Sequence, residues 1–285
     1  MPMKPIKNNP LVTAVIPTFN RGWCLADAVT SVINQKYPAM EIIVVDDGST
    51  DNTSQVLEPY MDSVTLLHQK NTGVSAARNL GISQSSGEFV AFLDSDDRWT
   101  PDKITCQVDF FQHHPEAMIC QTEEIWIRNG KRVNPKFKHK KPSGMIFEPS
   151  LELCLVSPSA VMMRRQFFDI KGLFDENLPA CEDYDLWLRT ATDMPIYLVD
   201  HPCTIKQGGH SDQLSSAHSL DQYRIQSIEG LLKAGTLSHT QQKAAVLVLR
   251  KKYTIYGKGC IKRGKLDEGQ RCFDREAALS NLYPH

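Results

Sequence analysis

The pattern that decides the fold is clearest in the stretch Glu41-Ile-Ile-Val-Val-Asp-Asp-Gly-Ser-Thr-Asp51. A short run of apolar, β-branched residues is typical of a buried strand, and an acidic turn follows it directly. Gly48 permits a sharp turn, and Asp51 can cap a helix that we expect to continue through about Pro59. The stretch therefore predicts a strand, a turn and a helix, with Asp46 and Asp47 at the end of the strand.

The same rhythm continues on both sides of this stretch. Apolar segments at 11–16, 64–68 and 88–93 predict further strands, and helical spacing predicts helices over 24–35 and 73–84. Strands that alternate with helices in this way indicate an α/β fold with a mostly parallel central sheet. Because ligands bind beyond the carboxyl ends of the strands in open α/β sheets, the acidic clusters after these strands mark the expected site.

The pattern is less regular after Pro101. We expect a helix to about His113, a helix over 182–192, strands near 118–128, 159–163, 196–199 and 204–207, and a basic loop over 129–143. Beyond residue 216 the spacing predicts only helices, at about 218–234, 240–256 and 267–280. The chain is therefore expected to contain an α/β domain over 1–215 and a small all-α extension over 216–285.

The composition is that of an ordinary globular protein. Hydrophobic residues make up 41% of the 285 residues and charged residues 23%, which argues against a disordered or membrane-embedded chain. The polar first ten residues hold no apolar core of a secretory signal, and no apolar run approaches the ~20 residues of a membrane helix. Since the eight cysteines form no C-x-x-C pair, we expect reduced thiols and a cytoplasmic protein.

The net charge of -1 is the sum of two oppositely charged parts. Residues 1–215 carry a balance of -7, and residues 216–285 carry a balance of +6. The basic loop at 129–143 lies in the acidic part, so we expect either a solvated loop or a lid over an anionic acceptor, and no nucleic-acid partner. The basic extension is compatible with docking on the acidic domain, on a partner protein or peripherally on the inner face of an anionic membrane.

The segment Leu93-Asp-Ser-Asp-Asp97 brings three carboxylates together at a strand end. Carboxylates this close repel one another, so the cluster favours a compensating cation. Mg²⁺ and Mn²⁺ prefer such oxygen ligands and commonly hold the phosphates of a substrate as well. The alternative from the residues alone is a solvated acidic turn before the helix that follows Pro101.

A third acidic group lies in Glu182-Asp-Tyr-Asp-Leu-Trp-Leu-Arg189. Glu182 and Asp183 fall in the first turn of a predicted helix, where the helix dipole stabilises anions. They are either ordinary helix-end charges or a general base directed at a cleft. The chain has no G-x-x-x-x-G-K-[ST], G-x-G-x-x-G or H-E-x-x-H motif, so P-loop, dinucleotide and zinc-protease sites lack their fingerprints.

Taken together and in this order, the motifs resemble those of family 2 glycosyltransferases, which have the GT-A fold. The resemblance also includes Val15-Ile-Pro-Thr-Phe-Asn-Arg21 and Asn71-Thr-Gly-Val-Ser-Ala-Ala-Arg-Asn79. It covers roughly residues 11–215 and leaves 216–285 outside. The resemblance implies transfer of a sugar from a nucleotide-diphosphate sugar, with UDP as the expected nucleotide, to a hydroxyl of a glycan, lipid-linked or protein acceptor.

The resemblance also implies a nucleotide site. Its expected members are Pro17, Thr18 and Asn20 beside the nucleotide, Asp47 as acceptor of a uracil-type N3–H, Arg78 at the base or diphosphate, and Asp94 with Ser95 at the ribose or metal-bound water.

The remaining implied residues concern the metal and the chemistry. Asp96 would bind the Mn²⁺ or Mg²⁺ that bridges the diphosphate, and His210 would approach the same ion. Family members usually carry Arg two residues before this histidine, where the present chain has Gly208. Asp183 would be the catalytic base, with Glu182 as the second choice. The implied reaction is a single displacement that inverts the anomeric centre.

Two other functions are compatible with an acidic α/β site. A nucleotidyltransferase also uses metal-binding acids, although the chain lacks a basic, glycine-rich triphosphate loop after the first strand. A non-catalytic sugar-nucleotide scaffold would retain binding without turnover. Release of a nucleoside diphosphate, of pyrophosphate or of neither separates the three.

Overall fold

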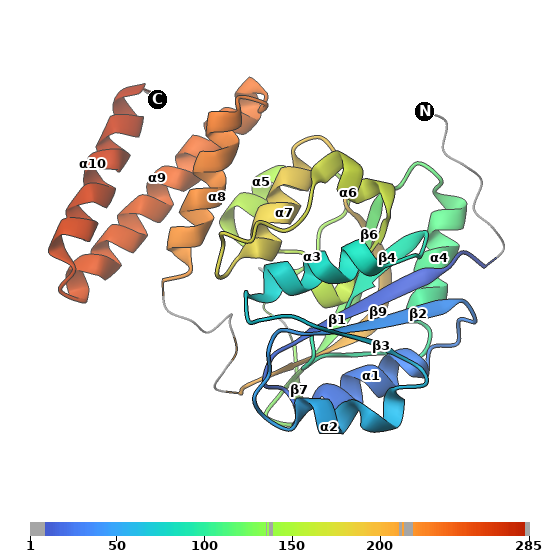
Figure 1. The fold of residues 1–285 in the computed structure, drawn as a ribbon. Coiled ribbons are helices and arrows are strands. Elements are labelled where there is room, and N and C mark those ends of the chain that lie inside the picture. The colour runs from blue at the N-terminus through green and yellow to red at the C-terminus, as the bar shows by residue number, and fades with distance from the viewer. Residues whose placement is uncertain (1–8, 135, 137–138, 211–212, 214–218, 283–285) are drawn as a thin grey trace.

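The structure is a computed structural model that describes residues 9–282 apart from 135, 137–138, 211–212 and 214–218. A curved sheet forms its centre, with helices against both faces, and three helices of the C-terminal part stand at one side (Figure 1). This arrangement confirms the predicted α/β class and the helical character of the C-terminal part.

The first half of the sheet is parallel and is built by the regular part of the sequence. Its strands lie in the order β3-β2-β1-β4, with all three pairs parallel. Their bounds are β1 (Val12–Thr18), β2 (Met40–Asp46), β3 (Thr65–His68) and β4 (Phe89–Phe92). The intervening helices are α1 (Leu25–Ile33), α2 (Thr53–Leu57) and α3 (Val74–Gln84).

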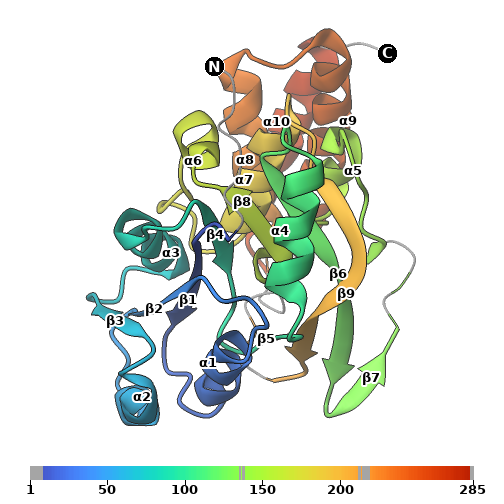
Figure 2. The same cartoon turned by 90° about the vertical axis from the view of Figure 1, so that its right-hand side faces the viewer.

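The second half of the sheet is mixed. It continues from β4 in the order β8-β6-β9-β5, with β7 paired to β6, and only the β6–β9 pair is parallel (Figure 2). The bounds are β5 (Arg98–Trp99), β6 (Ile119–Arg128), β7 (Lys131–Val133), β8 (Val161–Arg164) and β9 (Tyr197–Gly208). The helices here are α4 (Lys103–His113), α5 (Phe147–Glu152), α6 (Gln166–Lys171) and α7 (Glu182–Ala191).

Several elements of this half differ from the prediction. β9 is one strand of 12 residues where two short strands were expected, because register shifts between Thr122 and Glu124 on β6 accommodate its polar centre around Pro202. The expected loop at 129–143 contains β7, which the turn at Asn129 and Gly130 joins to β6 as a hairpin. α5 and α6 have six residues each, too few to show a helical period in the sequence.

Apolar side chains alternate along the parallel strands and form a core on each face of the sheet. On one face, Ile16 and Val44 pack against α1 and α4. On the other, Val15 and Val45 belong to a cluster that includes Trp187 of α7. This second cluster places α7, and with it the predicted base, over the sheet.

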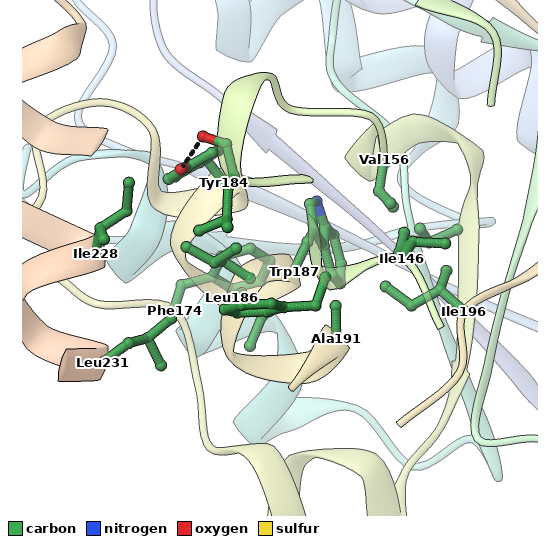
Figure 3. Packing of buried hydrophobic residues seen from close by; sticks show 14 of the residues in the cluster. Ile146, Val156, Phe174, Tyr184, Leu186, Trp187, Ala191, Ile196, Ile228 and Leu231 are labelled. Carbon is green, nitrogen blue, oxygen red and sulfur yellow. Dashed lines mark hydrogen bonds between the residues drawn. The ribbon is translucent and has the colours of Figure 1, made fainter. Parts of the chain in front are cut away.

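The C-terminal helices belong to the same hydrophobic cluster. These are α8 (Asp221–Ala234), α9 (His239–Lys262) and α10 (Leu266–Leu282), so α9 extends beyond its expected end. Ile228 and Leu231 of α8 lie on the side of the cluster that holds Phe174 and Leu186 (Figure 3). Among the described residues, no helix combines the length and the apolar character that crossing a membrane requires.

Close contact between α9 and α10 depends on two glycines. A Cβ atom at Gly257 would lie 2.9 Å from Phe273 Cε1, and one at Gly269 would lie 2.6 Å from Ile261 Cδ1. The N-terminus of α9 is stabilised by a capping box in which Ser238 and Gln241 exchange side-chain and backbone hydrogen bonds. The extension is therefore a packed part of the fold.

Candidate active site

A cavity of about 710 Å³ lies at the carboxyl ends of β1, β2 and β4. Its position agrees with the general rule for open α/β sheets. The cavity brings together ten residues that the sequence singled out: Pro17, Thr18, Asn20, Asp47, Arg78, Asp94, Ser95, Asp96, Glu182 and Asp183. His210 joins the group through Asp96, since its Nε2 lies 2.7 Å from Asp96 Oδ2.

Asp47 is held in a fixed orientation at the end of β2. Its Oδ1 accepts hydrogen bonds from Gln69 Nε2 at 2.7 Å and from the backbone N–H of Thr72 at 2.9 Å. Its Oδ2 accepts from the backbone N–H of Gly73 at 2.8 Å, and Gly73 adopts a φ of 100° just before α3. The loop before α3 therefore orients the carboxylate in the cavity wall.

Asn20 joins the loops that follow β1 and β2. Its backbone N–H donates to Ser49 Oγ at 2.8 Å, and its side-chain Oδ1 accepts from the backbone N–H of Thr50 at 2.8 Å. Its φ of 51° lies in the left-handed region, which asparagine tolerates better than most residues. Nearby, Thr18 Oγ1 is buried and has no hydrogen-bond partner within the described part of the chain.

Arg78 connects the end of β4 to the start of α7. Its Nη1 donates to Glu182 Oε1 at 2.5 Å, and its Nη2 donates to Asp94 Oδ1 at 2.7 Å. Burial works to lower the pKa of Arg78, but the two carboxylates outweigh burial and raise it. Arg78 is thus a buried cation in the cavity wall whose two outer nitrogens already bind protein carboxylates.

The neighbouring residue on α3 strengthens this connection. Asn79 Nδ2 donates to the backbone oxygen of Phe174 at 2.9 Å, and Phe174 N–H donates back to Asn79 Oδ1 at 3.1 Å. The Arg78 guanidinium also lies 5.2 Å from the centre of the Phe174 ring. Helix α3 therefore fixes the segment that leads into α7.

Glu182 and Asp183 have different environments, although they are adjacent in sequence. Burial raises the pKa of Glu182, opposed by Arg78, and the Glu182 side chain is only 7% exposed. Asp183 accepts from the backbone N–H of Tyr184 at 2.7 Å and from Cys154 Sγ at 3.5 Å. Burial raises the pKa of the Cys154 thiol well above its usual value, so this contact is with a neutral donor. Glu182 is therefore paired with a cation, whereas Asp183 lines the cavity with neutral partners.

The three acids after β4 also differ from one another. Asp94 binds Arg78. Burial alone would raise the pKa of Asp94, but the charge of Arg78, and to a smaller extent that of Lys206, lowers this pKa below its usual value. Asp97 accepts from Ser159 Oγ at 2.6 Å, and burial raises its pKa to about 8. Asp96 contacts His210 and belongs to the cavity lining.

Lys206 on β9 is a cation that the sequence analysis missed. Its Nζ lies 3.8 Å from Asp97 Oδ2 and donates to Ser157 Oγ at 3.1 Å. Burial acts to lower its pKa, yet the surrounding carboxylates, Asp97 first, raise it. Lys206 fell in an expected strand, and only the pairing of that strand with β6 and β5 brings it to the acids.

The pair Asp96 and His210 fits a divalent cation. A carboxylate oxygen and an imidazole nitrogen are donors that Mn²⁺ accepts, and the carboxylate also suits Mg²⁺. Both side chains are partly exposed, at 18% and 16%. Of the three acids, Asp94 binds the Arg78 guanidinium and Asp97 accepts from the Ser159 hydroxyl, whereas Asp96 pairs with His210.

Comparison with known sequences shows to which family the chain belongs. The family model described as glycosyl transferase family 2 matches residues 13–170, more than half of the chain. An uncharacterized glycosyltransferase of Rickettsia felis is 31% identical over 215 residues, and the alignment covers 72% of this chain. The chain spans only 35% of the length of that relative.

A second curated relative is the Escherichia coli protein WfgD, a UDP-Glc:alpha-D-GlcNAc-diphosphoundecaprenol beta-1,3-glucosyltransferase. It is 29% identical over 192 residues, which cover 67% of this chain and 73% of WfgD.

Solved structures show the same fold. The structure of Staphylococcus aureus TarS 1-349 with UDP-GlcNAc has a TM-score of 0.73 and 20% identity, and the match covers 93% of this chain and 79% of TarS. The mannosyltransferase PcManGT of Pyrobaculum calidifontis, in complex with GDP-Man and Mn²⁺, has a TM-score of 0.60 and 17% identity over 99% of this chain and 83% of that one. The family match and the fold agree with the motifs around the cavity: the chain belongs to glycosyl transferase family 2 and has the GT-A fold.

Proposed function

We propose that this protein is a metal-dependent, inverting glycosyltransferase that moves a sugar from a UDP-sugar to an acceptor hydroxyl. The proposal rests on the different partners of the carboxylates around one cavity. Arg78 binds Asp94 and Glu182, while Asp96 and Asp183 remain at the cavity surface with other partners. Two carboxylates in different environments suit two different chemical roles.

The donor nucleotide would lie against the loops after β1 and β2. Among the described residues, Asp47 Oδ2 accepts one hydrogen bond, from the backbone N–H of Gly73, and a second lone pair can accept the N3–H of a uracil base. Thr18 Oγ1 is buried without a partner among the described residues, so a polar group of the nucleotide would satisfy it. The UDP-GlcNAc bound in the TarS structure supports UDP as the nucleotide.

The diphosphate leaving group requires positive charge. Asp96 and His210 would hold Mn²⁺ or Mg²⁺, which when bound stabilises the charge that develops on the diphosphate. The Mn²⁺ in the PcManGT structure supports this cofactor. Lys206, which borders the same cavity, would add a second cation on the protein itself.

Asp183 would remove the proton of the acceptor hydroxyl. A carboxylate base takes this proton as the new bond forms, and attack from the face opposite the leaving group inverts the anomeric centre. Glu182 is the weaker candidate because Arg78 occupies its carboxylate.

The acceptor is proposed to belong to polysaccharide, glycolipid or glycoprotein glycan synthesis. The lipid-linked acceptor in the name of WfgD supports a lipid-linked glycan. A cytoplasmic site of action, with the basic extension in peripheral contact with an anionic membrane or a partner protein, remains a prediction.

The test is an assay of diphosphate release. Purified protein is incubated with a panel of UDP-sugars, for which water serves as the acceptor hydroxyl, and in parallel with UTP and a sugar phosphate. Each series is run with Mn²⁺, with Mg²⁺ or with chelator, and UDP and pyrophosphate are measured separately. We expect UDP release that requires the metal and stops in Asp183→Asn, while UDP binding, followed by thermal shift, is retained. Pyrophosphate release from a nucleoside triphosphate would instead indicate a nucleotidyltransferase, and binding without release of either product would indicate a scaffold.

A further inference from the structure

A second cavity lies where the C-terminal helices meet the active site. It has a volume of about 240 Å³ and is bordered by α8, by α9 and by the segment just before α8. Leu220 and Arg224 line both this cavity and the larger one. The two cavities are therefore neighbours that share these two residues.

The second cavity has an excess of positive charge. Arg224 and Arg263 line it, and the acid that lines it is Asp221. Asp221 Oδ1 accepts from Arg224 Nη1 at 3.1 Å and lies 3.5 Å from Lys252 Nζ, so two cations share its one charge. Arg263 is exposed, and its Nη2 contacts Cys260 Sγ, a weak acceptor, at 3.7 Å. These groups favour an anion in the cavity.

Arg224 holds a hydrogen-bond donor that the protein leaves unused. Its Nε is buried and has no hydrogen-bond partner within the part of the chain that the structure describes. A buried, unpaired donor on a cation is unfavourable unless a ligand accepts from it. Phosphate oxygens are strong acceptors for guanidinium groups, so they fit this position well.

The cavity lies next to the proposed base. The Arg224 guanidinium is 6.0 Å from the centre of the Tyr184 ring, and Tyr184 directly follows Asp183. At the same junction, Cys181 Sγ, just before α7, lies 3.8 Å from the backbone oxygen of Leu220. A molecule anchored in the second cavity would therefore extend toward the start of α7, where Asp183 lies.

One wall of the cavity is apolar and open. Ile255 lines it and is 51% exposed. Leu220 and Tyr256 also line the cavity. Cations beside apolar side chains suit a phosphate that is joined to a hydrocarbon chain.

We propose that the cavity between α8 and α9 binds the phosphate or diphosphate of the acceptor, and that the acceptor is a lipid-linked sugar phosphate. This inference rests on the proposed function, because it names the substrate that would enter beside Asp183. It also gives a role to two cations of the basic C-terminal extension, Arg224 and Arg263, since α8 and α9 would form the acceptor half of the site.

The experiment uses the full chain with saturating UDP and Mg²⁺, which fill the donor site. Geranyl phosphate and inorganic phosphate are titrated separately by calorimetry. We expect geranyl phosphate to bind, and inorganic phosphate to bind at least about tenfold more weakly because it cannot contact the apolar wall. Equal affinities would overturn the proposal, since they would indicate an anion site without selection for a lipid.

Two variants and a matched control test the residues. Arg263→Gln removes an exposed cation of the cavity, and Arg224→Gln/Arg263→Gln removes both. Lys262→Gln removes the same charge from the neighbouring exposed position, which does not line the cavity. We expect the double variant to lose at least about tenfold in affinity for geranyl phosphate, Arg263→Gln to lose part of this, and Lys262→Gln to stay within about twofold of the parent.

Two results would overturn the proposal. Unchanged binding in Arg263→Gln, a variant at an exposed position, would show that the cavity does not hold the phosphate. An equal loss in Lys262→Gln would show a general basic surface, as for an anionic membrane. The UDP titration is read separately: if UDP and UDP-sugars do not bind, the proposed function fails, whereas normal UDP binding with no effect of the arginines refutes only the acceptor site.

Discussion

Replacing Arg78 with methionine tests how the two halves of the active site are held together. Arg78 binds Asp94 at 2.7 Å and Glu182 at 2.5 Å, and its side chain is only 4% exposed. Methionine has a similar length and no charge, so both carboxylates lose their cation, and Glu182, whose side chain is 7% exposed, stays shielded from water. Removing one partner of a buried ion pair typically costs about 3–5 kcal/mol of folding free energy. We expect Arg78→Met to lose stability in this range at pH 7.5.

The loss should depend on pH. Burial already raises the pKa of Glu182 above its usual value, and Arg78 is the main group that opposes this rise, so its loss raises the pKa further. A carboxyl group whose pKa is raised in the folded state favours folding below its unfolded pKa, and this contribution is lost as the pH rises through the folded pKa. The stability deficit of Arg78→Met should therefore be smaller at pH 5 than at pH 7.5.

Urea unfolding, followed by tryptophan fluorescence at both pH values, measures the effect. Arg98→Met is the control, because Arg98 pairs with the exposed Asp27 at 3.6 Å and such a pair contributes about 0–1 kcal/mol. Arg78→Met/Glu182→Gln should recover part of the lost stability by removing one buried charge. Equal unfolding midpoints for Arg78→Met and the parent at pH 7.5, or a deficit that does not change with pH, would refute the reasoning.

Three further predictions concern the base, the metal and a buried lysine. Asp183→Asn should lower kcat by about 10²–10⁴ with unchanged UDP affinity; near-parental turnover would exclude Asp183 as the base. Asp96→Ala should lose both activity and the thermal shift that Mn²⁺ produces in the presence of UDP; a retained Mn²⁺ response would place the metal elsewhere. Burial lowers the pKa of Lys103 to about 7, so its charged form opposes folding at acidic pH. Lys103→Met should therefore gain stability over the parent at pH 6, and the gain should shrink by about 1.4 kcal/mol per pH unit between pH 7 and 10 as the folded-state lysine becomes neutral; urea unfolding that shows a pH-independent difference would contradict this.

Local sequence determined the parallel half of the fold and the position of the site. The apolar strands and helical periods before Leu93 predicted β1–β4 and α1–α3, because burial on both faces leaves a continuous apolar run. The acids that follow these strands met at one edge because parallel strands end on the same side. The second half was less predictable, since β7 and the centre of β9 are polar and β9 is shaped by its register with β6.

The basic loop contains a further feature that the sequence did not predict, the burial of one lysine. Lys141 was expected in a solvated or lid-like segment with its neighbours. In the structure its Nζ is buried and binds Gln121 Oε1 at 3.0 Å and Glu124 Oε1 at 3.2 Å. Both partners come from β6, and composition alone does not reveal that one lysine of a basic run turns inward.

The sequence by itself predicted that acids gather at the carboxyl edge of an α/β sheet and that their motifs resemble those of family 2 glycosyltransferases. Only the tertiary structure decided which acid has which partner. Glu182 and Asp183 are adjacent in the chain, yet Arg78, 104 residues away from Glu182, binds one and leaves the other at the cavity. Lys206 reaches Asp97 in the same way, through the pairing of β9 with β5 and β6. The physical reason is that the spacing of apolar residues in the sequence indicates which side of a helix or strand is buried. The electrostatics of a site depend instead on contacts between elements that are distant in the chain.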